Sequence, residues 1–182
     1  MKTHKDRVRL RQILTEKMPR QSVPLSLYFD TKGRRFRLCR LGQRDLDELV
    51  QMYVHFNHEQ NTMGLPPRRE NQIREWLNRL FASDVQLVAK LGHEVVAHAA
   101  WIKDSSTRAE VIVFVHQDYQ GLGLGKKLLM AVVTMARFMD LDVLWAEVEN
   151  RNSIMIHINH ELGFETVDLH QSSRQMALAD LD

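Results

Sequence analysis

At residues 120–127 the chain has the sequence Gln120-Gly121-Leu122-Gly123-Leu124-Gly125-Lys126-Lys127. This glycine-rich segment joins an apolar, strand-like run at residues 111–115 to a long amphipathic pattern that ends near Met139. A glycine turn between a strand and a helix presents free backbone N–H groups at the positive end of the helix dipole, where phosphate groups bind. The segment therefore predicts a strand, a phosphate-binding loop and a helix in succession.

The spacing of the glycines separates three kinds of phosphate-binding loop. A P-loop needs Gly at position 120 and Ser or Thr at position 127, but the chain has Gln120 and Lys127 there. A dinucleotide-binding fingerprint needs a third Gly at position 126, where Lys126 opposes close packing of the helix on the strand. Neither pattern fits. The pattern that fits is Gln-x-x-Gly-x-Gly, formed by Gln120, Gly123 and Gly125.

This pattern resembles the pyrophosphate-binding motif of the GNAT superfamily of N-acetyltransferases. A second segment, from Asn152 to Phe164, matches Asn-x-x-(Ala or Met)-x-x-aliphatic-x-x-x-Leu-Gly-Phe, which is the other half of the acyl-CoA site in that family. The two motifs have the order and separation of the family, and the resemblance covers residues 34–179. Together with Ala109-Glu110 and residues 118–125, they are most similar to the catalytic domain of Pat-type bacterial protein lysine acetyltransferases.

The resemblance implies a mixed α/β fold of the GNAT type. Its central sheet is twisted and mostly antiparallel, with about six to seven strands and about four flanking helices, and is splayed between the fourth and fifth strands. Hydrophobic periodicity and turn residues predict strands at residues 25–29, 36–41, 85–89, 95–102, 109–116, 143–148, 165–169 and 175–178. They predict helices from residue 44 or 45 to before Asn57, over 69–81, from the glycine loop to near Met139, and over 153–162.

The resemblance also implies which residues bind the cofactor, acetyl-CoA. In this fold the strand that carries the ligand separates from its neighbour, so backbone groups of Val113, Phe114 and Val115 are free to bond the pantetheine amides. Asn152 is expected beside the pantetheine arm, and Met155 is a further residue expected to bind the cofactor. The pyrophosphate is expected at the loop residues Gln120, Gly121, Leu122, Gly123, Leu124, Gly125 and Lys126.

Transfer of an acetyl group to an amine needs a base, because a free lysine amine titrates near about 10.4. Glu110 is the candidate, since it opens the strand before the loop and shares a face with Ile112 and Phe114 by the period of two. It also matches the glutamate that serves as the base in Pat-type enzymes. Glu147 and Glu149 lie on one face of the next predicted strand and are the competing candidates.

The general acid is not assigned. Many family members have a Tyr where this chain has Asn159, and an amide cannot donate a proton to a thiolate as a phenol does. Pat-type relatives often lack that Tyr, and a CoA thiol with a pKa near the roughly 8.5 of cysteine leaves without an acid. His157, His160 and Tyr119 are nearby alternatives that the helical pattern does not favour.

Length and composition predict a single domain. The chain has 182 residues, of which 44% are hydrophobic and 26% charged, enough to bury a core. Residues 1–20 have a net charge of +5 and the remainder −3, so a basic leader at 1–24 is expected before a domain at 25–182. No apolar run approaches the roughly 18 residues of a membrane span, no secretory signal is found, and a cytoplasmic protein is expected. Cys39 falls in a strand, which predicts a packing role.

No metal is expected. His55, His58 and Glu59 lack the order of the common zinc-protease motifs, and His157 and His160 have no third ligand near them in the sequence.

Three functions remain open, in order of preference. The first is an acetyl-CoA-dependent N-acetyltransferase that acts on a protein lysine or a small amine by direct attack on the thioester. The second is a catalytically silent acyl-CoA binding or regulatory module. The third is a nucleic-acid-associated protein that uses the basic leader, although no aromatic residue interleaves its charges as a stacking platform requires. The acceptor is not identified by the sequence, and a homodimer is left open.

Overall fold

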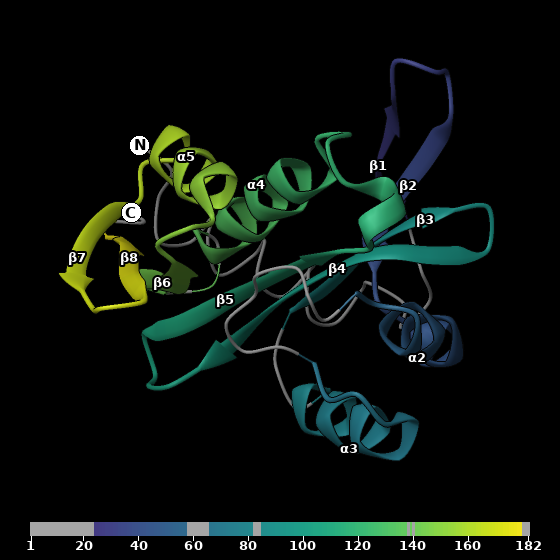
Figure 1. Ribbon diagram of the computed structural model, residues 1–182, viewed down its shortest axis with the longest axis horizontal. Helices are drawn as coiled ribbons and strands as arrows, with labels where there is room; N and C mark the ends of the chain where they lie inside the picture. Colours follow the sequence, from purple (N-terminus) through teal and green to yellow (C-terminus); the bar gives the residue numbers. More distant parts are fainter. Residues whose placement is uncertain (1–23, 58–65, 82–84, 138, 140, 180–182) are drawn as a thin grey trace, which may run out of the picture.

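The structure is a computed structural model that describes residues 24–57, 66–81, 85–137, 139 and 141–179 (Figure 1). Its strands are β1 (Pro24–Phe29), β2 (Arg35–Arg40), β3 (Gln86–Leu91), β4 (Glu94–Lys103), β5 (Arg108–Val115), β6 (Val143–Glu149), β7 (Glu165–Leu169) and β8 (Ser173–Leu178). Its helices are α2 (Leu46–Val54), α3 (Glu70–Leu80), α4 (Leu124–Ala136) and α5 (Ser153–Glu161), with short 3-10 turns η1 (Gln43–Asp45) and η2 (Gln117–Tyr119). All eight strands form one sheet, with α4 and α5 on one face and α2 and α3 on the other (Figure 1).

The sheet confirms the predicted mixed α/β fold. The strand order is β1-β2-β3-β4-β5-β6-β8-β7, and every neighbouring pair is antiparallel except β5 and β6. The sheet has the eight strands that periodicity predicted, including both terminal hairpins, β1–β2 and β7–β8, whereas the resemblance implied about six to seven. Most of the predicted leader at 1–24 and of the predicted loop at 61–67 lies outside the described residues.

The sheet separates between β5 and β6, its fifth and sixth strands in chain order. β4 and β5 pair over seven residues, from Ala97 to Lys103 on β4, so the expected position between the fourth and fifth strands is wrong. β5 and β6 pair only at residues 108–110 and 143–145. The separation nevertheless lies beside the strand that leads into the glycine loop, which is β5.

The predicted succession of strand, glycine loop and helix is confirmed. Gly121 and Gly123 have φ angles of 72° and 79°, a left-handed conformation that glycine adopts without steric cost. Gly123 is the N-cap of α4. The helix ends at Ala136, three residues before the predicted end near Met139.

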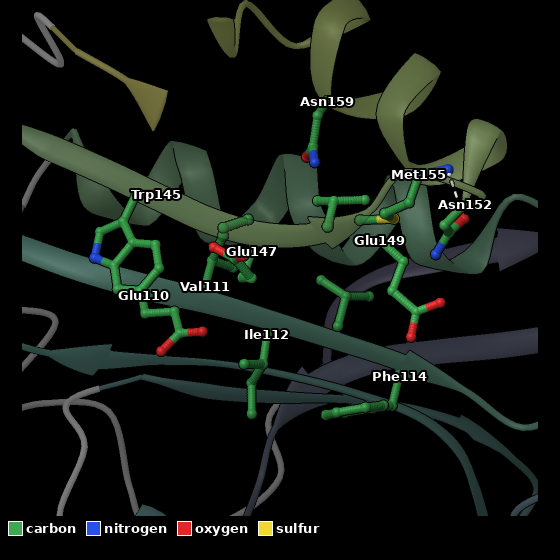
Figure 2. A pocket seen from close by; sticks show the side chains of 13 residues that line it. Glu110, Val111, Ile112, Phe114, Trp145, Glu147, Glu149, Asn152, Met155 and Asn159 are labelled. Carbon is green, nitrogen blue, oxygen red and sulfur yellow. Dashed lines mark hydrogen bonds between the residues drawn. The ribbon is translucent and has the colours of Figure 1, made fainter. Parts of the chain in front are cut away.

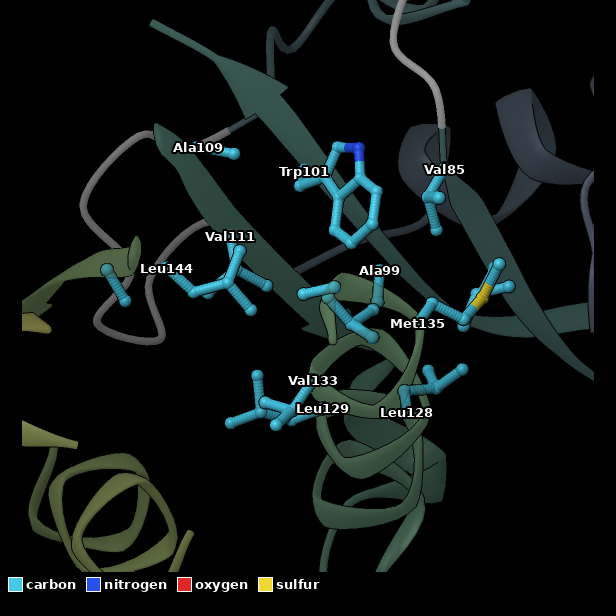
Figure 3. Close-up of a cluster of buried hydrophobic side chains, with 14 of the residues drawn as sticks. Val85, Ala99, Trp101, Ala109, Val111, Leu128, Leu129, Val133, Met135 and Leu144 are labelled. Carbon is cyan, nitrogen blue, oxygen red and sulfur yellow. The ribbon is translucent and has the colours of Figure 1, made fainter. Parts of the chain in front are cut away.

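A large apolar core lies between α4 and the sheet (Figure 3). Leu128, Leu129, Val132 and Val133 recur at helical spacing and are buried against β4 and β5. Trp101 of β4 is fully buried in the same cluster. Because these side chains fix α4 on the sheet, they also fix the glycine loop at its N-terminus.

None of the helices within the described ranges has the length and apolar character needed to cross a membrane.

A second apolar core lies on the opposite face, beneath α2 and α3. Tyr53 of α2 is fully buried, and its ring meets that of Phe114 edge to face with centroids 5.7 Å apart. Trp76 of α3 contacts both rings. Cys39 is buried in this core, which raises the pKa of its thiol and agrees with the predicted packing role. These contacts hold Phe114 from behind.

A buried polar chain supports Tyr53. Its hydroxyl lies 2.7 Å from His98 Nδ1, and His98 Nε2 lies 3.2 Å from Gln86 Oε1. Burial lowers the pKa of His98 to about 3, so the imidazole is neutral near pH 7. Gln86 donates its Nε2 to the Leu80 carbonyl, which leaves Oε1 to accept. His98 therefore carries its proton on Nε2, and Nδ1 accepts from the Tyr53 hydroxyl.

The first prediction concerns the acid stability of this chain of hydrogen bonds. Below the ordinary His pKa of 6.5 the unfolded protein protonates His98, whereas the folded protein keeps it neutral down to about pH 3. The free energy of unfolding should fall with falling pH through that window, by about 1.4 kcal/mol per pH unit from this group. In urea unfolding between about pH 6 and 5, a His98→Gln variant should show a correspondingly smaller slope. Equal slopes in the two proteins would contradict a neutral buried histidine.

The second prediction separates two glycines of the loop. Gly123→Ala should lower the free energy of unfolding by about 1 to 2 kcal/mol or more. The backbone at residue 123 has a positive φ angle that alanine rarely adopts, and the added Cβ would lie 3.2 Å from Tyr28 Oη. Gly125→Ala is the matched control, since residue 125 lies inside α4 and the added Cβ would lie 3.5 Å from Val115 Cγ2, an ordinary van der Waals distance. It should be neutral or stabilising by roughly 0.5 to 1 kcal/mol. Equal destabilisation of both variants in urea unfolding would refute the predicted difference between Gly123 and Gly125.

Candidate functional site

Two adjoining pockets open where β5 and β6 separate. The larger, of about 540 Å³, lies between the end of β5, the glycine loop and the start of α5. The smaller, of about 380 Å³, lies between β5 and β6. Four residues line both pockets: Val113, Phe114, Asn152 and Met155. The two pockets therefore meet at four of the residues that the resemblance implies for cofactor binding.

The edge of β5 that faces β6 is the floor of this cleft. Beyond Glu110 and Trp145 the two strands no longer pair, so residues 111–115 have no β6 partner in the described part of the chain. Backbone amides and carbonyls away from water need hydrogen-bond partners. The free edge at Val113, Phe114 and Val115 can supply such bonds to an extended ligand that carries amides of its own.

The glycine loop borders the larger pocket. Its predicted residues Gln120, Gly121, Gly123, Leu124, Gly125 and Lys126 all line this pocket, together with Val115 at the end of β5. The Gln120 side chain donates from Nε2 to the Val115 carbonyl at 3.1 Å and so ties the loop to the strand. Leu122 lines neither pocket and packs instead against the core of the α4 face.

Tyr28 of the β1–β2 hairpin braces the loop. Its hydroxyl donates to the Leu122 carbonyl at 2.6 Å, and its ring lies 5.8 Å from Lys127 Nζ. In a planar trans peptide the carbonyl and the following N–H point in opposite directions. With the Leu122 carbonyl held on Tyr28, the N–H of Gly123 is directed away from Tyr28. The sequence contained no signal for this contact, because 94 positions separate the two residues.

The charges beside the loop are partly paired. Lys126 Nζ lies 2.9 Å from Glu161 Oε2, and this hydrogen bond lowers the pKa of Glu161. Asn152 accepts the Met155 backbone N–H on its Oδ1 at 3.1 Å and so caps α5 (Figure 2). The Asn152 side chain therefore has a structural task in addition to its place at the junction of the pockets.

Glu110 lies in the smaller pocket, where the predicted base is expected (Figure 2). It is half-buried and shares the face of β5 with Ile112 and Phe114, as predicted from the strand period. Burial raises the pKa of Glu110, and the negative charges of Glu147 and Asp104 raise it further. A carboxylate with a raised pKa is the stronger base.

The two competing glutamates line the same pocket but have partners. Glu149 forms an ion pair with Arg151, with Nε and Oε2 2.6 Å apart. Glu147 accepts a hydrogen bond from the Ser173 hydroxyl. Both carboxylates thus already have a partner, whereas no hydrogen bond or ion pair joins the Glu110 side chain to another residue in the described ranges. The geometry thus favours Glu110 among the three, although all remain candidates.

Asn159 of α5 reaches the smaller pocket from the opposite side (Figure 2). Its side chain is fully buried and donates from Nδ2 to Met176 Sδ at 3.7 Å. Its Oδ1 is buried with no hydrogen-bond partner in the structure as described. His157 and His160 line neither pocket, and His160 Nδ1 bonds the Phe164 carbonyl.

Metal-ligating groups do not converge in the described ranges. No group of three or more His, Cys, Asp or Glu there could hold a metal ion. His55 Nδ1 lies 2.9 Å from the Gln51 carbonyl, while His58 and Glu59 lie outside the described residues.

Comparison with known proteins agrees with this arrangement. The sequence model of the Acetyltransferase (GNAT) family matches residues 46–164. L-amino acid N-acyltransferase MnaT of Escherichia coli (strain K12) is 33% identical over 100 residues, which cover 52% of this chain and 58% of that protein. Mycothiol acetyltransferase of Propionibacterium freudenreichii subsp. shermanii is 29% identical over 140 residues, covering 72% of this chain and 43% of that protein. The aligned segments thus span less than two thirds of these relatives.

Solved structures share the fold. The GNAT domain of S. lividans PAT matches with a TM-score of 0.71 at 20% identity, covering 85% of this chain and 96% of that chain. The structure of yncA from Salmonella typhimurium, which holds acetyl-CoA, matches with a TM-score of 0.64 at 24% identity, covering 81% and 94%. Since the family model also matches more than half of the sequence, including the glycine loop and the α5 motif, the chain belongs to the acetyltransferase (GNAT) family of N-acetyltransferases.

Proposed function

We propose that this protein is an acetyl-CoA-dependent N-acetyltransferase that acts on a primary amine by direct attack of the amine on the thioester. One observation carries the proposal. A glycine loop at a helix N-terminus and a half-buried carboxylate, Glu110, line two pockets that meet at Val113, Phe114, Asn152 and Met155. One pocket suits a phosphorylated thioester and the other suits an amine that must lose a proton.

Acetyl-CoA belongs in the larger pocket. Backbone N–H groups of residues 121–125 and the positive end of the α4 dipole favour its pyrophosphate. The free edge of β5 at Val113, Phe114 and Val115 suits the amides of the pantetheine arm. The yncA structure with acetyl-CoA, although only 24% identical, shows that a protein of this fold holds that molecule.

The chemistry follows from the order of the pockets along β5. An acceptor that binds as an ammonium first loses one proton to Glu110, directly or through a water, and Glu110 passes it to solvent. The neutral amine nitrogen then attacks the thioester carbonyl carbon, its second proton leaves by the same route, and the carbon–sulfur bond breaks. A backbone N–H of β5 can stabilise the oxyanion. Asn159 cannot supply a proton to the departing sulfur, so CoA leaves as a thiolate, with a pKa near the roughly 8.5 of cysteine.

A silent acyl-CoA binding module is the second candidate. The observation that favours it is Asn159, which stands where many relatives have the tyrosine acid. Such a module would bind acetyl-CoA in the same pocket without releasing thiol in the presence of any amine. The nucleic-acid function, the homodimer and the cytoplasmic location stay predictions from the sequence.

The third prediction tests the base. Glu110→Gln should lower kcat by at least about 100-fold with an accepted amine, because general base catalysis contributes roughly 10² to 10⁴. Acetyl-CoA binding should be kept, since Glu110 does not line the larger pocket. Glu165→Gln, at an exposed site on β7, is the control and should keep full activity.

The pH dependence of the same reaction adds a second readout. The raised pKa of Glu110 means that activity should increase with pH as this carboxyl ionises, at a pH above the ordinary 4.5. That acidic limb should be missing from the residual activity of Glu110→Gln. Thiol release at full rate by Glu110→Gln would reassign the base to Glu147 or Glu149.

The fourth prediction concerns Tyr28. Tyr28→Phe removes the hydrogen bond that holds the Leu122 carbonyl and keeps the ring beside Lys127. One neutral hydrogen bond stabilises by about 0.5 to 1.5 kcal/mol, so acetyl-CoA should bind roughly 2- to 10-fold more weakly in isothermal titration. Once saturated with acetyl-CoA, the variant should keep its kcat.

The matched control is Thr134→Val. This change also removes a hydroxyl that donates to a carbonyl, that of Met130, but on an exposed part of α4 that borders neither pocket. Its affinity for acetyl-CoA should equal that of the unchanged protein. Equal affinities for all three proteins would show that Tyr28 does not position the loop.

A further inference from the structure

The polar lining of the smaller pocket is made almost entirely of hydrogen-bond acceptors. Its described lining contains the glutamates Glu110, Glu147 and Glu149, and none of its described residues is Lys, Arg or His. The Trp145 Nε1–H, a donor, is used by Asp104 at 2.9 Å. The amides of Asn152 and Asn159 are the exceptions, because each has an N–H that can still donate.

The negative charge of this pocket is only partly neutralised. Arg151 neutralises Glu149 at the end nearest the larger pocket. Glu147 has a neutral partner, the Ser173 hydroxyl, and no hydrogen bond or ion pair joins the Glu110 side chain to another described residue. Glu110 and Glu147 lie at the same end of the pocket (Figure 2). A cation is therefore favoured at that end, and an anion is not.

Asn159 provides a second observation at the same pocket. Its amide group points into the pocket (Figure 2), its side chain is fully buried, and its Oδ1 has no partner within the described ranges. Since Nδ2 is engaged with Met176, Oδ1 is oriented to accept. Buried acceptors without partners are rare in folded proteins because they lose their bonds to water. Because this oxygen is inaccessible in the structure, a ligand N–H in the pocket would satisfy it only after a small shift of the side chains around it.

We propose that this pocket takes the acceptor as an alkylammonium that has no carboxylate beside its amine. This inference rests on the proposed function and specifies its substrate class. The N–H groups of such an ammonium can meet Glu110, Glu147 and Asn159 Oδ1. A lysine side chain in a polypeptide and a free aliphatic amine share this chemistry.

A free α-amino acid is disfavoured by the same residues. Its carboxylate is one carbon from the amine and would enter the pocket with it. There it would face Glu110 and Glu147 with no cationic side chain in the described lining, and like charges in a partly desolvated site repel strongly. By this inference the chain differs from its relative MnaT, whose name states an L-amino acid N-acyltransferase.

The experiment compares acceptors that differ only at the carboxylate. Acetyl-CoA thiol release is measured with L-methionine and with 3-(methylthio)propylamine, which is methionine without its carboxylate. The amine should be used with a kcat/KM at least about tenfold higher, equivalent to 1.4 kcal/mol, although its higher amine pKa handicaps it. Two further acceptors, cadaverine and Nα-acetyl-lysine amide, distinguish a free amine from a lysine side chain.

The outcomes distinguish a failure of this inference from a failure of the proposed acetyltransferase function on which it rests. An equal or higher kcat/KM for L-methionine overturns the inference and leaves the acetyltransferase function standing. Absence of thiol release with every acceptor, while acetyl-CoA still binds, overturns the acetyltransferase function and the inference with it.

Two variants test the residues. Glu147→Gln, which can still accept a hydrogen bond from Ser173, should lower kcat/KM for 3-(methylthio)propylamine by about tenfold. It should also lower the ratio of that kcat/KM to the value for L-methionine. Asn159→Leu replaces the unpartnered amide by an apolar group of similar size. It should raise the melting temperature by about 2 to 4 °C and lower kcat/KM for the amine.

The Asn159 variant distinguishes a ligand contact from a structural role. A purely structural asparagine would change the melting temperature and leave kcat/KM for the amine at its original value. Unchanged amine selectivity in both variants would overturn the assignment of these two residues to the acceptor.

Discussion

The short parallel pairing of β5 and β6 is the constraint on which the site depends. Parallel neighbours need a crossover connection, which the glycine loop and α4 provide. Because the two strands bond only at residues 108–110 and 143–145, the β5 edge beyond Glu110 has no strand partner within the described ranges. An unpaired edge on the floor of a cleft can bind the amides of a ligand. The direction of β5 then places Glu110 at one end of that edge and the glycine loop at the other.

The two ends of the cleft differ in charge. The loop end has the positive pole of α4 and Lys126, whereas the other end has Glu110 and Glu147 without a cation in the described lining. Lys126 is paired with Glu161 at the loop end, and the Arg151–Glu149 ion pair joins a residue of the larger pocket to one of the smaller pocket. A polyanion and a cation can therefore occupy the cleft together, with the uncharged thioester between them. This polarity links the cofactor half of the site to the proposed class of acceptor.

Groups that line neither pocket support the cleft from behind. The chain Tyr53, His98 and Gln86 is fully hydrogen bonded in the interior and holds Phe114 through the Tyr53 ring. A second buried interaction joins Lys90 Nζ to Asp45 Oδ1 at 2.7 Å, beneath the start of α2. Satisfied polar networks of this kind specify one arrangement of a core, because any other arrangement leaves a buried group unpaired. On the α4 face, close packing of apolar side chains specifies the arrangement of the core instead.

Periodicity and glycine spacing, which are local signals, predicted the helices and strands to within a few residues, and two short motifs indicated the family and the cofactor loop. Local signals do not determine distances between remote segments, and the remaining features depend on those distances. Tyr28 reaches Leu122 across 94 positions, and the choice of Glu110 over Glu149 rests on an ion pair with Arg151. The place where the sheet separates depends on which strands join it, which the loop motif does not encode. The sequence shows that Asn159 stands where many family members have an acidic Tyr, but only folding buries its Oδ1 without a partner in the described ranges and places it in the lining of the smaller pocket.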